Sequence, residues 1–245
     1  MQKRVLLLFD FDGTLAPLSG RNDAARLSEE IRGLLGSLQA RPGVGVAVLS
    51  GRSLKDLQAR VDMPALYYGG NHGLEIAGPG ISFRHAGAVA RRSIVQDLAA
   101  RIESDLGRVP GASLENKGLT LSVHYRRVAR RSRRSLAWLR SRIRVDASGL
   151  PVRWGAGRKV WELLPRVKWH KGAASLYLMR HLGNPFPIAL GDDTTDEDIF
   201  SALKGRGLSI RVGRLKSSRA DYYLIDQGQV ARFLRETRAA LEGRG

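Results

Sequence analysis

The chain has 245 residues, no cysteine and a formal charge of +18 at pH 7. This length is sufficient for one large domain or two modest ones, and the lack of cysteine excludes a disulfide framework and thiolate metal sites. A cysteine-free chain fits a reducing compartment, so we expect a cytoplasmic protein. No segment approaches the ~20 apolar residues of a membrane span, and the first apolar run ends after Phe9, too early for a secretory signal.

The first third of the chain predicts strands that alternate with a helix. Short apolar runs that end in Gly, Ser or Asp are typical of buried parallel strands, and they occur at residues 5–9, 44–49 and 65–68. Between the first two runs, leucine and isoleucine recur with helical spacing from Leu27 to Leu38. This part of the chain therefore predicts a strand, an amphipathic helix and two further strands.

The middle of the chain follows a different pattern. Residues 74–83 predict a hairpin with a Gly-Pro-Gly turn, and residues 119–125 alternate apolar and polar side chains. Alternation of this kind predicts a sheet with one covered face and one polar face. Two helical stretches, near 88–106 and 130–143, are long enough to cover the apolar face. We therefore expect an inserted α+β cap domain at residues 81–166.

The positive charge is concentrated in this middle part. Residues 79–167 hold 19 Lys and Arg against 6 Asp and Glu, and the arginine-rich stretch 126–144 carries much of the excess. Such a balance can indicate nucleic acid or an acidic membrane surface as a partner. The chain has no zinc-finger spacing, no RNP-like aromatic motif and no tandem repeat, so we expect a solvated helix face, with neither nucleic acid nor membrane as partner.

The last third returns to the alternation of helices and strands. The segment after Lys171 predicts a helix that ends at Gly183, and a buried strand follows at 187–190. Residues 208–212 and 222–225 predict strands at the edge of the sheet. The apolar periodicity near the C-terminus predicts a final helix.

The order of all these elements predicts an α/β fold. Strands that alternate with helices form a doubly wound parallel sheet, here made by residues 1–80 and 167–245 on either side of the cap at 81–166. The sequence does not specify an oligomeric state, and we expect a monomer.

Polar side chains follow three of the predicted parallel strands. Asp10 and Asp12 follow the first strand, Ser50 follows the second, and Asp192 and Asp193 follow the strand after the Lys171 helix. Ligands of open α/β sheets bind at the carboxyl ends of strands, so we expect the carboxylates of Asp10 and Asp192 to converge. Like charges at short distance need a cation, and Mg²⁺ suits oxygen ligands where no cysteine or histidine pair competes.

The spacing of the first two aspartates indicates acid and base catalysis on a phosphate. Along an extended segment, Asp10 and Asp12 would project to the same side. One carboxylate can attack phosphorus while the other protonates the leaving alkoxide and then activates water. Gly13 permits a turn and Thr14 supplies a hydroxyl. Lys171, at a predicted helix start, can neutralise phosphoryl oxygens.

Four motifs, DFDGTLAP, LSGR, Lys171 and GDDTTDED, occur in the order found in the haloacid dehalogenase (HAD) superfamily of phosphatases, which the chain resembles. The resemblance covers the whole core and implies an HAD-like fold. It implies that Asp10 is the nucleophile and Asp12 the general acid and base. It also implies that Ser50 and Lys171 bind the phosphate.

The same resemblance implies a Mg²⁺ site. Asp192 would bind the ion beside the Asp10 carboxylate and the backbone carbonyl of Asp12. Asp193 and Asp196 would orient this ligand shell, and we include Asp193 among the candidate metal residues.

Three further stretches, GNHGLE, ENKGLTLSVHYR and GRKVWELLP, resemble trehalose-6-phosphate phosphatases. This resemblance implies Mg²⁺-dependent hydrolysis of trehalose 6-phosphate to trehalose and phosphate through an aspartyl-phosphate, the last step of trehalose biosynthesis. The cap would close over the sugar and select it. Carboxylates, amides and amines on the polar face of a sheet can bind sugar hydroxyls through charge-assisted hydrogen bonds.

The second resemblance also assigns residues to the substrate. It places Glu115, Lys117 and Glu162 on the sugar, and Asn71 and His72 in the loop between core and cap. The candidate substrate-binding residues are Thr14, Gly51, Arg52, Asn71, His72, Glu115, Lys117 and Glu162.

Alternative functions are compatible with the sequence. Leu164 stands before Pro165, where that family usually carries a basic residue. An HAD phosphatase for another sugar phosphate, such as sucrose phosphate or mannosylphosphoglycerate, is therefore one alternative. A basic protein that binds nucleic acid or another polyanion is an alternative of a different class.

Several candidate residues also have purely structural interpretations. Ser50 could cap a helix that begins near Ser53, and Glu115 and Lys117 could form an ordinary salt bridge. The acidic TTDED stretch favours the N-terminus of a helix, which would account for Glu197 without a function.

Overall fold

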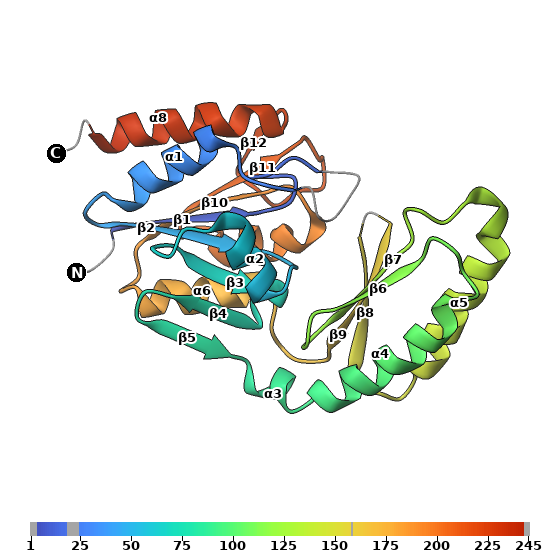
Figure 1. Ribbon diagram of the computed structural model, residues 1–245. Helices are drawn as coiled ribbons and strands as arrows, with labels where there is room; N and C mark the ends of the chain where they lie inside the picture. Colours follow the sequence, from blue (N-terminus) through green and yellow to red (C-terminus); the bar gives the residue numbers. More distant parts are fainter. Residues whose placement is uncertain (1–3, 19–24, 158, 243–245) are drawn as a thin grey trace. The chain divides into compact units, whose positions relative to one another are not determined.

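The structure is a computed structural model that describes residues 4–18, 25–157 and 159–242. Arg158, in the stretch GRKVWELLP, lies outside the described residues. The chain forms two compact units (Figure 1): the core unit, Met1–Phe83 with Trp169–Gly245, and the inserted unit, Arg84–Lys168.

The core unit is built on one sheet with the strand order β12-β11-β10-β1-β2-β3-β4-β5. Its strands are β1 (Val5–Asp10), β2 (Val44–Leu49), β3 (Tyr67–Gly70), β4 (Glu75–Gly78), β5 (Ile81–Arg84), β10 (Phe186–Gly191), β11 (Leu208–Val212) and β12 (Tyr222–Leu224). The strands from β12 to β3 are parallel, whereas β4 is antiparallel to β3. This arrangement confirms the predicted doubly wound sheet. The prediction of β11 as an edge strand is wrong, because β11 pairs with β10 on one side and β12 on the other.

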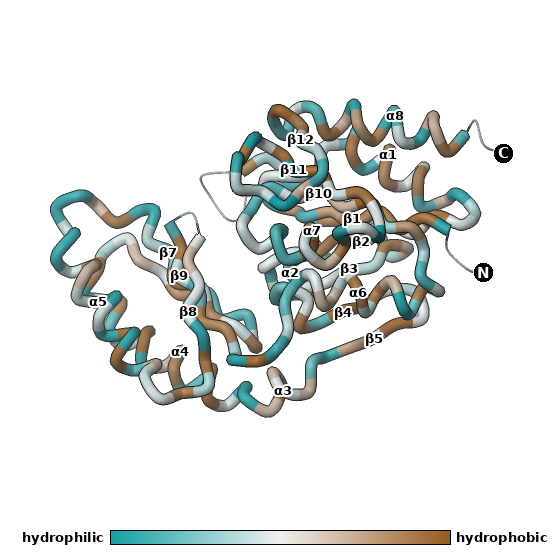
Figure 2. The backbone as a smooth tube through the Cα atoms, turned by 180° about the vertical axis from the view of Figure 1, so that it is seen from behind, coloured by the Kyte–Doolittle hydropathy of each residue, from teal (hydrophilic) through white to brown (hydrophobic). Residues whose placement is uncertain are grey.

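Helices cover both faces of this sheet. One face packs against α1 (Glu29–Gln39), α2 (Leu54–Val61) and α8 (Val230–Glu242), and the other against α6 (Lys171–His181) and α7 (Glu197–Leu203). Successive side chains of a strand point to opposite faces, so Leu7 and Phe9 pack against the first group while Leu6 and Leu8 pack against the second. Hydrophobic residues are accordingly concentrated along the central strands (Figure 2).

The inserted unit is a second, antiparallel sheet with helices on one face. The sheet has the order β6-β7-β9-β8, and its strands are β6 (Ser113–Asn116), β7 (Leu121–His124), β8 (Val152–Gly157) and β9 (Val160–Pro165). Its helices are α3 (Ala86–Val89), α4 (Arg92–Leu106) and α5 (Arg133–Asp146). Val123 and Leu163 on the sheet pack against α4 and α5 through Leu98 and Leu139. The opposite face of the sheet is the polar one.

The arginine-rich stretch 126–144 exposes its arginines to solvent, as predicted for a solvated helix face. All nine of its arginines are exposed, and several belong to the outer side of α5. Among the helices that the structure describes, none is long and apolar enough to cross a membrane.

An aromatic cluster lies where the core unit connects to the inserted unit. The rings of Phe83 and Trp169 stack with centroids 5.1 Å apart, and Tyr177 of α6 lies 4.5 Å from Phe83. Trp169 Nε1 also donates a 2.7 Å hydrogen bond to the backbone carbonyl of Gly73. Phe83 is the last residue of the core unit before the insert and Trp169 the first one after it, so these contacts hold the two ends of the core together.

Candidate active site

The carboxyl ends of three neighbouring strands meet at one edge of the core sheet. β1 lies between β10 and β2, with Phe9 opposite Leu190 and Asp10 opposite Leu49. Ser50 follows β2 directly and Asp192 follows β10 directly. Polar groups at the ends of adjacent strands are thereby brought together, as parallel pairing requires.

Two buried carboxylates, one half-buried carboxylate and one buried lysine form the centre of this edge. Asp10, Asp192 and Asp196 each offer a carboxylate oxygen, and these atoms all lie within 4.8 Å of one another. Lys171 Nζ donates hydrogen bonds to Asp10 Oδ1 at 2.7 Å and to Asp196 Oδ1 at 2.8 Å. The Lys171 side chain is only 2% exposed. We call these four residues the carboxylate cluster.

Two glycines allow the carboxylates to approach so closely. Gly13 has a φ of +93°, and a Cβ on it would lie 2.3 Å from Asp192 Oδ2. A Cβ on Gly191 would lie 2.3 Å from Asp196 Cγ. The hydroxyl of the buried Thr14 donates to Asp192 Oδ1 at 3.3 Å and orients that carboxylate.

Burial and like charge dominate the electrostatics of the carboxylate cluster. Burial raises the pKa of Asp10 well above its usual value, although the charge of Lys171 opposes this. Burial, together with the carboxylates of Asp196 and Asp193, raises the pKa of Asp192 to about 6. Burial opposes the charged form of Lys171, but Asp10 and Asp196 outweigh it and raise the pKa of Lys171. The cluster carries more negative charge than one lysine neutralises, so a further cation would be stabilised there.

Replacing Asp192 with asparagine should stabilise the metal-free protein. The folded state raises the pKa of Asp192 from 3.8 to about 6, so it binds this proton more tightly than the unfolded state, and stability is lost as pH rises through this range. We expect Asp192→Asn to raise the free energy of unfolding by about 1 to 3 kcal/mol at pH 8, by less at pH 5 and by least near pH 4, where most of the folded protein already carries the proton. Urea unfolding in EDTA at these pH values measures the change in the free energy of unfolding. An equal increase at every pH would contradict an electrostatic cause.

Asp12 does not join the carboxylate cluster. β1 ends at Asp10 and Phe11 lies in a turn, so the extended segment expected through Asp12 is not formed. The Asp12 carboxylate instead accepts two hydrogen bonds of 2.6 Å from Nε and Nη2 of Arg52. Arg52 Nη1 donates in addition to Asp56 at 2.8 Å, which fixes the guanidinium between the two carboxylates. Asp10 and Asp12 are therefore held by different cations.

The loop at residues 50–52 begins with a buried serine and continues with two half-buried residues. Ser53, and not Ser50, caps α2, since its hydroxyl accepts a hydrogen bond from the backbone N–H of Asp56. The Ser50 side chain is 1% exposed, and its Oγ accepts a 3.2 Å hydrogen bond from the backbone N–H of Arg52, across Gly51. The structural interpretation of Ser50 as a helix cap is thus wrong.

The predicted loop residues Asn71 and His72 lie directly beside this segment. The backbone N–H of Asn71 donates to the carbonyl of Arg52 at 2.6 Å, and that of His72 to the carbonyl of Ser50 at 2.9 Å. Both residues are buried and have left-handed φ angles of 51° and 59°. Such conformations cost energy for residues other than glycine and persist where the surroundings impose them, often at functional sites.

The three predicted sugar-binding residues lie together in the inserted unit. Glu115 of β6 and Glu162 of β9 both pair with Ser122 of β7, so the two glutamates share the polar face of the sheet. Lys117 Nζ is 3.8 Å from Glu162 Oε1, while Glu115 Oε2 is 2.9 Å from Nε2 of His124. This face therefore presents carboxylates and an amine in one row.

The structure places Asp196, and not Asp193, in the carboxylate cluster. Asp193 is exposed, and its main contact is a hydrogen bond from its backbone N–H to Asp196 Oδ2 at 3.0 Å. Its side chain caps the short helix η4 (Thr194–Asp196). Asp196, expected only to orient the ligands, lies inside the cluster and is fully buried. The sequence GDDTTDED shows that several acids follow the strand. It does not show which of them points inward, because this depends on the turn of η4.

Comparisons with known proteins match most of the chain to one family. Residues 8–227 match the family described as Trehalose-phosphatase. The chain is 35% identical over 265 aligned residues to "Probable trehalose-phosphate phosphatase 9" of Oryza sativa subsp. japonica, with 96% of this chain and 70% of that protein covered. It is 37% identical over 212 residues to the trehalose-phosphate phosphatase of Mycobacterium tuberculosis, with 84% of this chain covered. The chain spans about half, 53%, of the length of that mycobacterial relative.

Solved structures share the fold. The C-terminal domain of the C. albicans trehalose-6-phosphate phosphatase superposes with a TM-score of 0.80 at 24% identity, covering 98% of this chain and 94% of that one. A haloacid dehalogenase-like hydrolase from Bacteroides thetaiotaomicron gives 0.69 at 17% identity, covering 96% and 100%. The family match extends over most of the sequence and includes Asp10, Lys171 and Asp192. The chain belongs to the trehalose-phosphatase family.

Proposed function

We propose that this chain is a Mg²⁺-dependent phosphatase that hydrolyses trehalose 6-phosphate to trehalose and phosphate, the last step of trehalose biosynthesis. One observation supports the proposal: in this chain, which belongs to the trehalose-phosphatase family, Asp10, Lys171 and Asp192 lie together at the carboxyl edge of the core sheet. We further propose that the protein acts as a monomer in the cytoplasm, with the sugar phosphate as its partner. The high positive charge favours encounter with a dianionic substrate.

The donor set of the carboxylate cluster fits Mg²⁺. Its oxygens come from carboxylates alone, and Mg²⁺ prefers a few carboxylates together with water and phosphate oxygens. We propose Asp10 and Asp192 as the side chains that hold the ion, with the backbone carbonyl of Asp12, and we assign to Asp196 the orientation of Lys171. When bound, Mg²⁺ supplies positive charge that offsets the repulsion between the carboxylates and a phosphate dianion.

Phosphoryl transfer then follows from the residues of the chain. An oxygen of Asp10 attacks phosphorus, the bond from phosphorus to the sugar oxygen breaks, and Asp12 gives a proton to the leaving alkoxide. Water next attacks the phosphorus of the aspartyl-phosphate, Asp12 takes the proton, and the bond to Asp10 breaks to release phosphate. Lys171 and Ser50 bind phosphoryl oxygens, and Arg52 holds the Asp12 carboxylate through two hydrogen bonds.

A phosphate-release assay over a panel of sugar phosphates tests this function. We expect the highest kcat/KM for trehalose 6-phosphate, compared with sucrose phosphate, mannosylphosphoglycerate and glucose 6-phosphate, and loss of turnover in EDTA. A preference for another sugar phosphate would retain the phosphatase and reject trehalose 6-phosphate. Turnover that persists in EDTA at full rate would reject the metal requirement.

Replacing Glu115 with alanine should separate sugar binding from phosphate chemistry. Glu115 lies on the polar face of the inserted sheet, which we assign to the sugar. A charge-assisted hydrogen bond contributes about 1.5 to 3 kcal/mol, so we expect kcat/KM for trehalose 6-phosphate to fall roughly 10- to 100-fold. Turnover of a small aryl phosphate, which has no sugar, should change less than about twofold.

The matched control is Glu103→Ala. Glu103 is an exposed glutamate on α4 of the same unit, and its replacement should leave both reactions unchanged. Equal losses on the sugar phosphate and the aryl phosphate in Glu115→Ala would remove Glu115 from sugar binding.

A further inference from the structure

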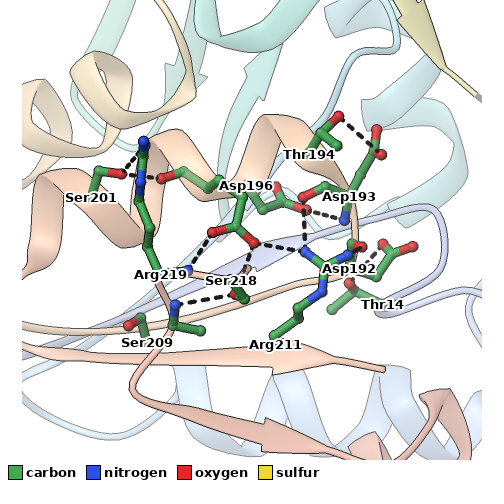
Figure 3. Close-up of polar contacts among 12 residues, drawn as sticks. Thr14, Asp192, Asp193, Thr194, Asp196, Ser201, Ser209, Arg211, Ser218 and Arg219 are labelled. Carbon is green, nitrogen blue, oxygen red and sulfur yellow. Dashed lines mark hydrogen bonds and ion pairs between the residues drawn. The ribbon is translucent and has the colours of Figure 1, made fainter. Parts of the chain in front are cut away.

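The loop that carries Asp192 is held by an arginine from the neighbouring strand (Figure 3). Arg211 of β11 lies opposite Gly191, the last residue of β10. Its Nη2 donates to the backbone carbonyl of Asp192, and its Nη1 donates to that of Asp193 at 3.3 Å. One guanidinium thus contacts two consecutive carbonyls immediately after the strand that leads into the carboxylate cluster.

Arg211 is itself fixed by a half-buried carboxylate. Its Nη1 lies 2.8 Å from Glu197 Oε1, and the two side chains are 11% and 15% exposed. Glu197 also accepts hydrogen bonds from the Ser218 hydroxyl at 2.8 Å and from the backbone N–H of Arg219 at 2.7 Å. Glu197 therefore connects α7 to β11 and to the segment at 218–219. An acid that only favoured the N-terminus of its helix would not need these contacts.

The geometry has a consequence for Asp192. Two hydrogen bonds from a planar guanidinium fix the peptide planes on either side of Asp193. The side chain of Asp192 is restrained from the opposite direction by Thr14. With its backbone and its carboxylate both held, Asp192 has little freedom to turn away from Asp10.

We propose that Arg211, anchored by Glu197, is a positioning residue that orients Asp192 for divalent-cation binding. The inference rests on the proposed metal site, but it assigns a role to two residues outside that site. Partners that orient metal ligands typically affect metal affinity by about 10- to 100-fold when they are removed. A mere structural ion pair would change stability and leave metal affinity as it is.

Binding of Mn²⁺ alone, followed by electron paramagnetic resonance, tests this proposal without any substrate. Mn²⁺ suits the same carboxylate oxygens as Mg²⁺. We expect Arg211→Met to raise the Kd for Mn²⁺ about 10- to 100-fold and Arg211→Lys, which retains the charge but not the fork, to give an intermediate value. At low Mg²⁺, Arg211→Met should hydrolyse trehalose 6-phosphate much more slowly than the wild type. At saturating Mg²⁺, the kcat of the variant should return toward the wild-type value.

The control is Arg219→Met, because the Arg219 side chain donates to the Ser201 hydroxyl at 2.9 Å, whereas the hydrogen bond to Glu197 comes from the backbone N–H of Arg219 and is kept in the variant. This variant should bind Mn²⁺ like the wild type. If Arg211→Met does not fold, Glu197→Gln tests the proposal in its place. The amide keeps the size of the side chain but weakens the ion pair with Arg211, so we expect a several-fold higher Kd for Mn²⁺. A folded Arg211→Met or Glu197→Gln with wild-type Mn²⁺ affinity would overturn the proposal.

The same experiment separates this inference from the proposed function. A wild-type protein that binds no Mn²⁺ would reject both the metal site and the role of Arg211. A wild-type protein that binds Mn²⁺ but does not release phosphate from trehalose 6-phosphate would reject only the substrate.

Discussion

Asp10→Asn should abolish phosphate release while leaving the fold intact. The amide cannot attack phosphorus as a carboxylate does, and loss of a covalent nucleophile reduces kcat by at least about a thousandfold. The fold should not suffer, because burial already raises the pKa of Asp10, so a neutral isostere removes an unfavourable charge. Phosphate release at saturating Mg²⁺ and thermal unfolding by circular dichroism measure the two effects.

A conservative control is available for this variant. Asp62 is exposed and ends α2 with a left-handed φ of 49°, a conformation that asparagine accepts readily. Asp62→Asn should therefore keep wild-type turnover and stability. Retention of more than a tenth of the wild-type rate in Asp10→Asn would exclude Asp10 as the nucleophile.

Lys171→Met should cause the largest loss of stability among the site variants. The ammonium group of Lys171 is the shared partner of Asp10 and Asp196, and all three side chains are almost completely buried. Removing one partner of a buried ion pair leaves an uncompensated charge and typically costs about 3 to 5 kcal/mol. Turnover should be lost as well, since no ammonium group remains to bind phosphoryl oxygens.

The pH dependence identifies the cause of this loss. Without Lys171, the Asp10 carboxylate has no cation to offset its burial, so the folded variant takes up a proton more readily than the unfolded chain. The destabilisation relative to wild type should therefore be greatest at pH 8 and smaller at pH 5, as measured by urea unfolding in EDTA. Lys204→Met, at an exposed lysine after α7, should have no effect at either pH. A Lys171→Met defect independent of pH would indicate lost packing instead.

The centre of the core sheet could be predicted because strands such as β1 and β2 are buried on both faces. A strand such as β1 then appears in the sequence as an uninterrupted apolar run followed by an acid, and the order of such runs determines a doubly wound sheet. The strands of the inserted sheet gave weaker signals. β6 has the sequence SLEN and β8 contains two glycines, so neither shows regular alternation, and only β7 was predicted as a strand.

The sequence predicted which strand ends carry the candidate site. It did not predict the direction in which each side chain points. Asp10 and Asp192 converge because parallel pairing aligns their strands. The direction of Asp12 depends on the turn at Phe11, and the inward position of Asp196 depends on η4. Local hydrogen bonds close both turns, but the cations that hold the two carboxylates, Arg52 and Lys171, come from distant segments, and no local pattern encodes these partners. The partnership of Arg211 with Glu197 is of the same kind.

The stacked rings of Phe83 and Trp169 have an evolutionary consequence. Because the polypeptide leaves and re-enters the catalytic unit at neighbouring points, 85 intervening residues could be exchanged for an unrelated module, or for a short connecting turn, without opening the parent architecture. Chemistry and choice of sugar can then diversify on separate stretches of one gene. A core of this kind can in this way acquire new substrates when its inserted unit is replaced.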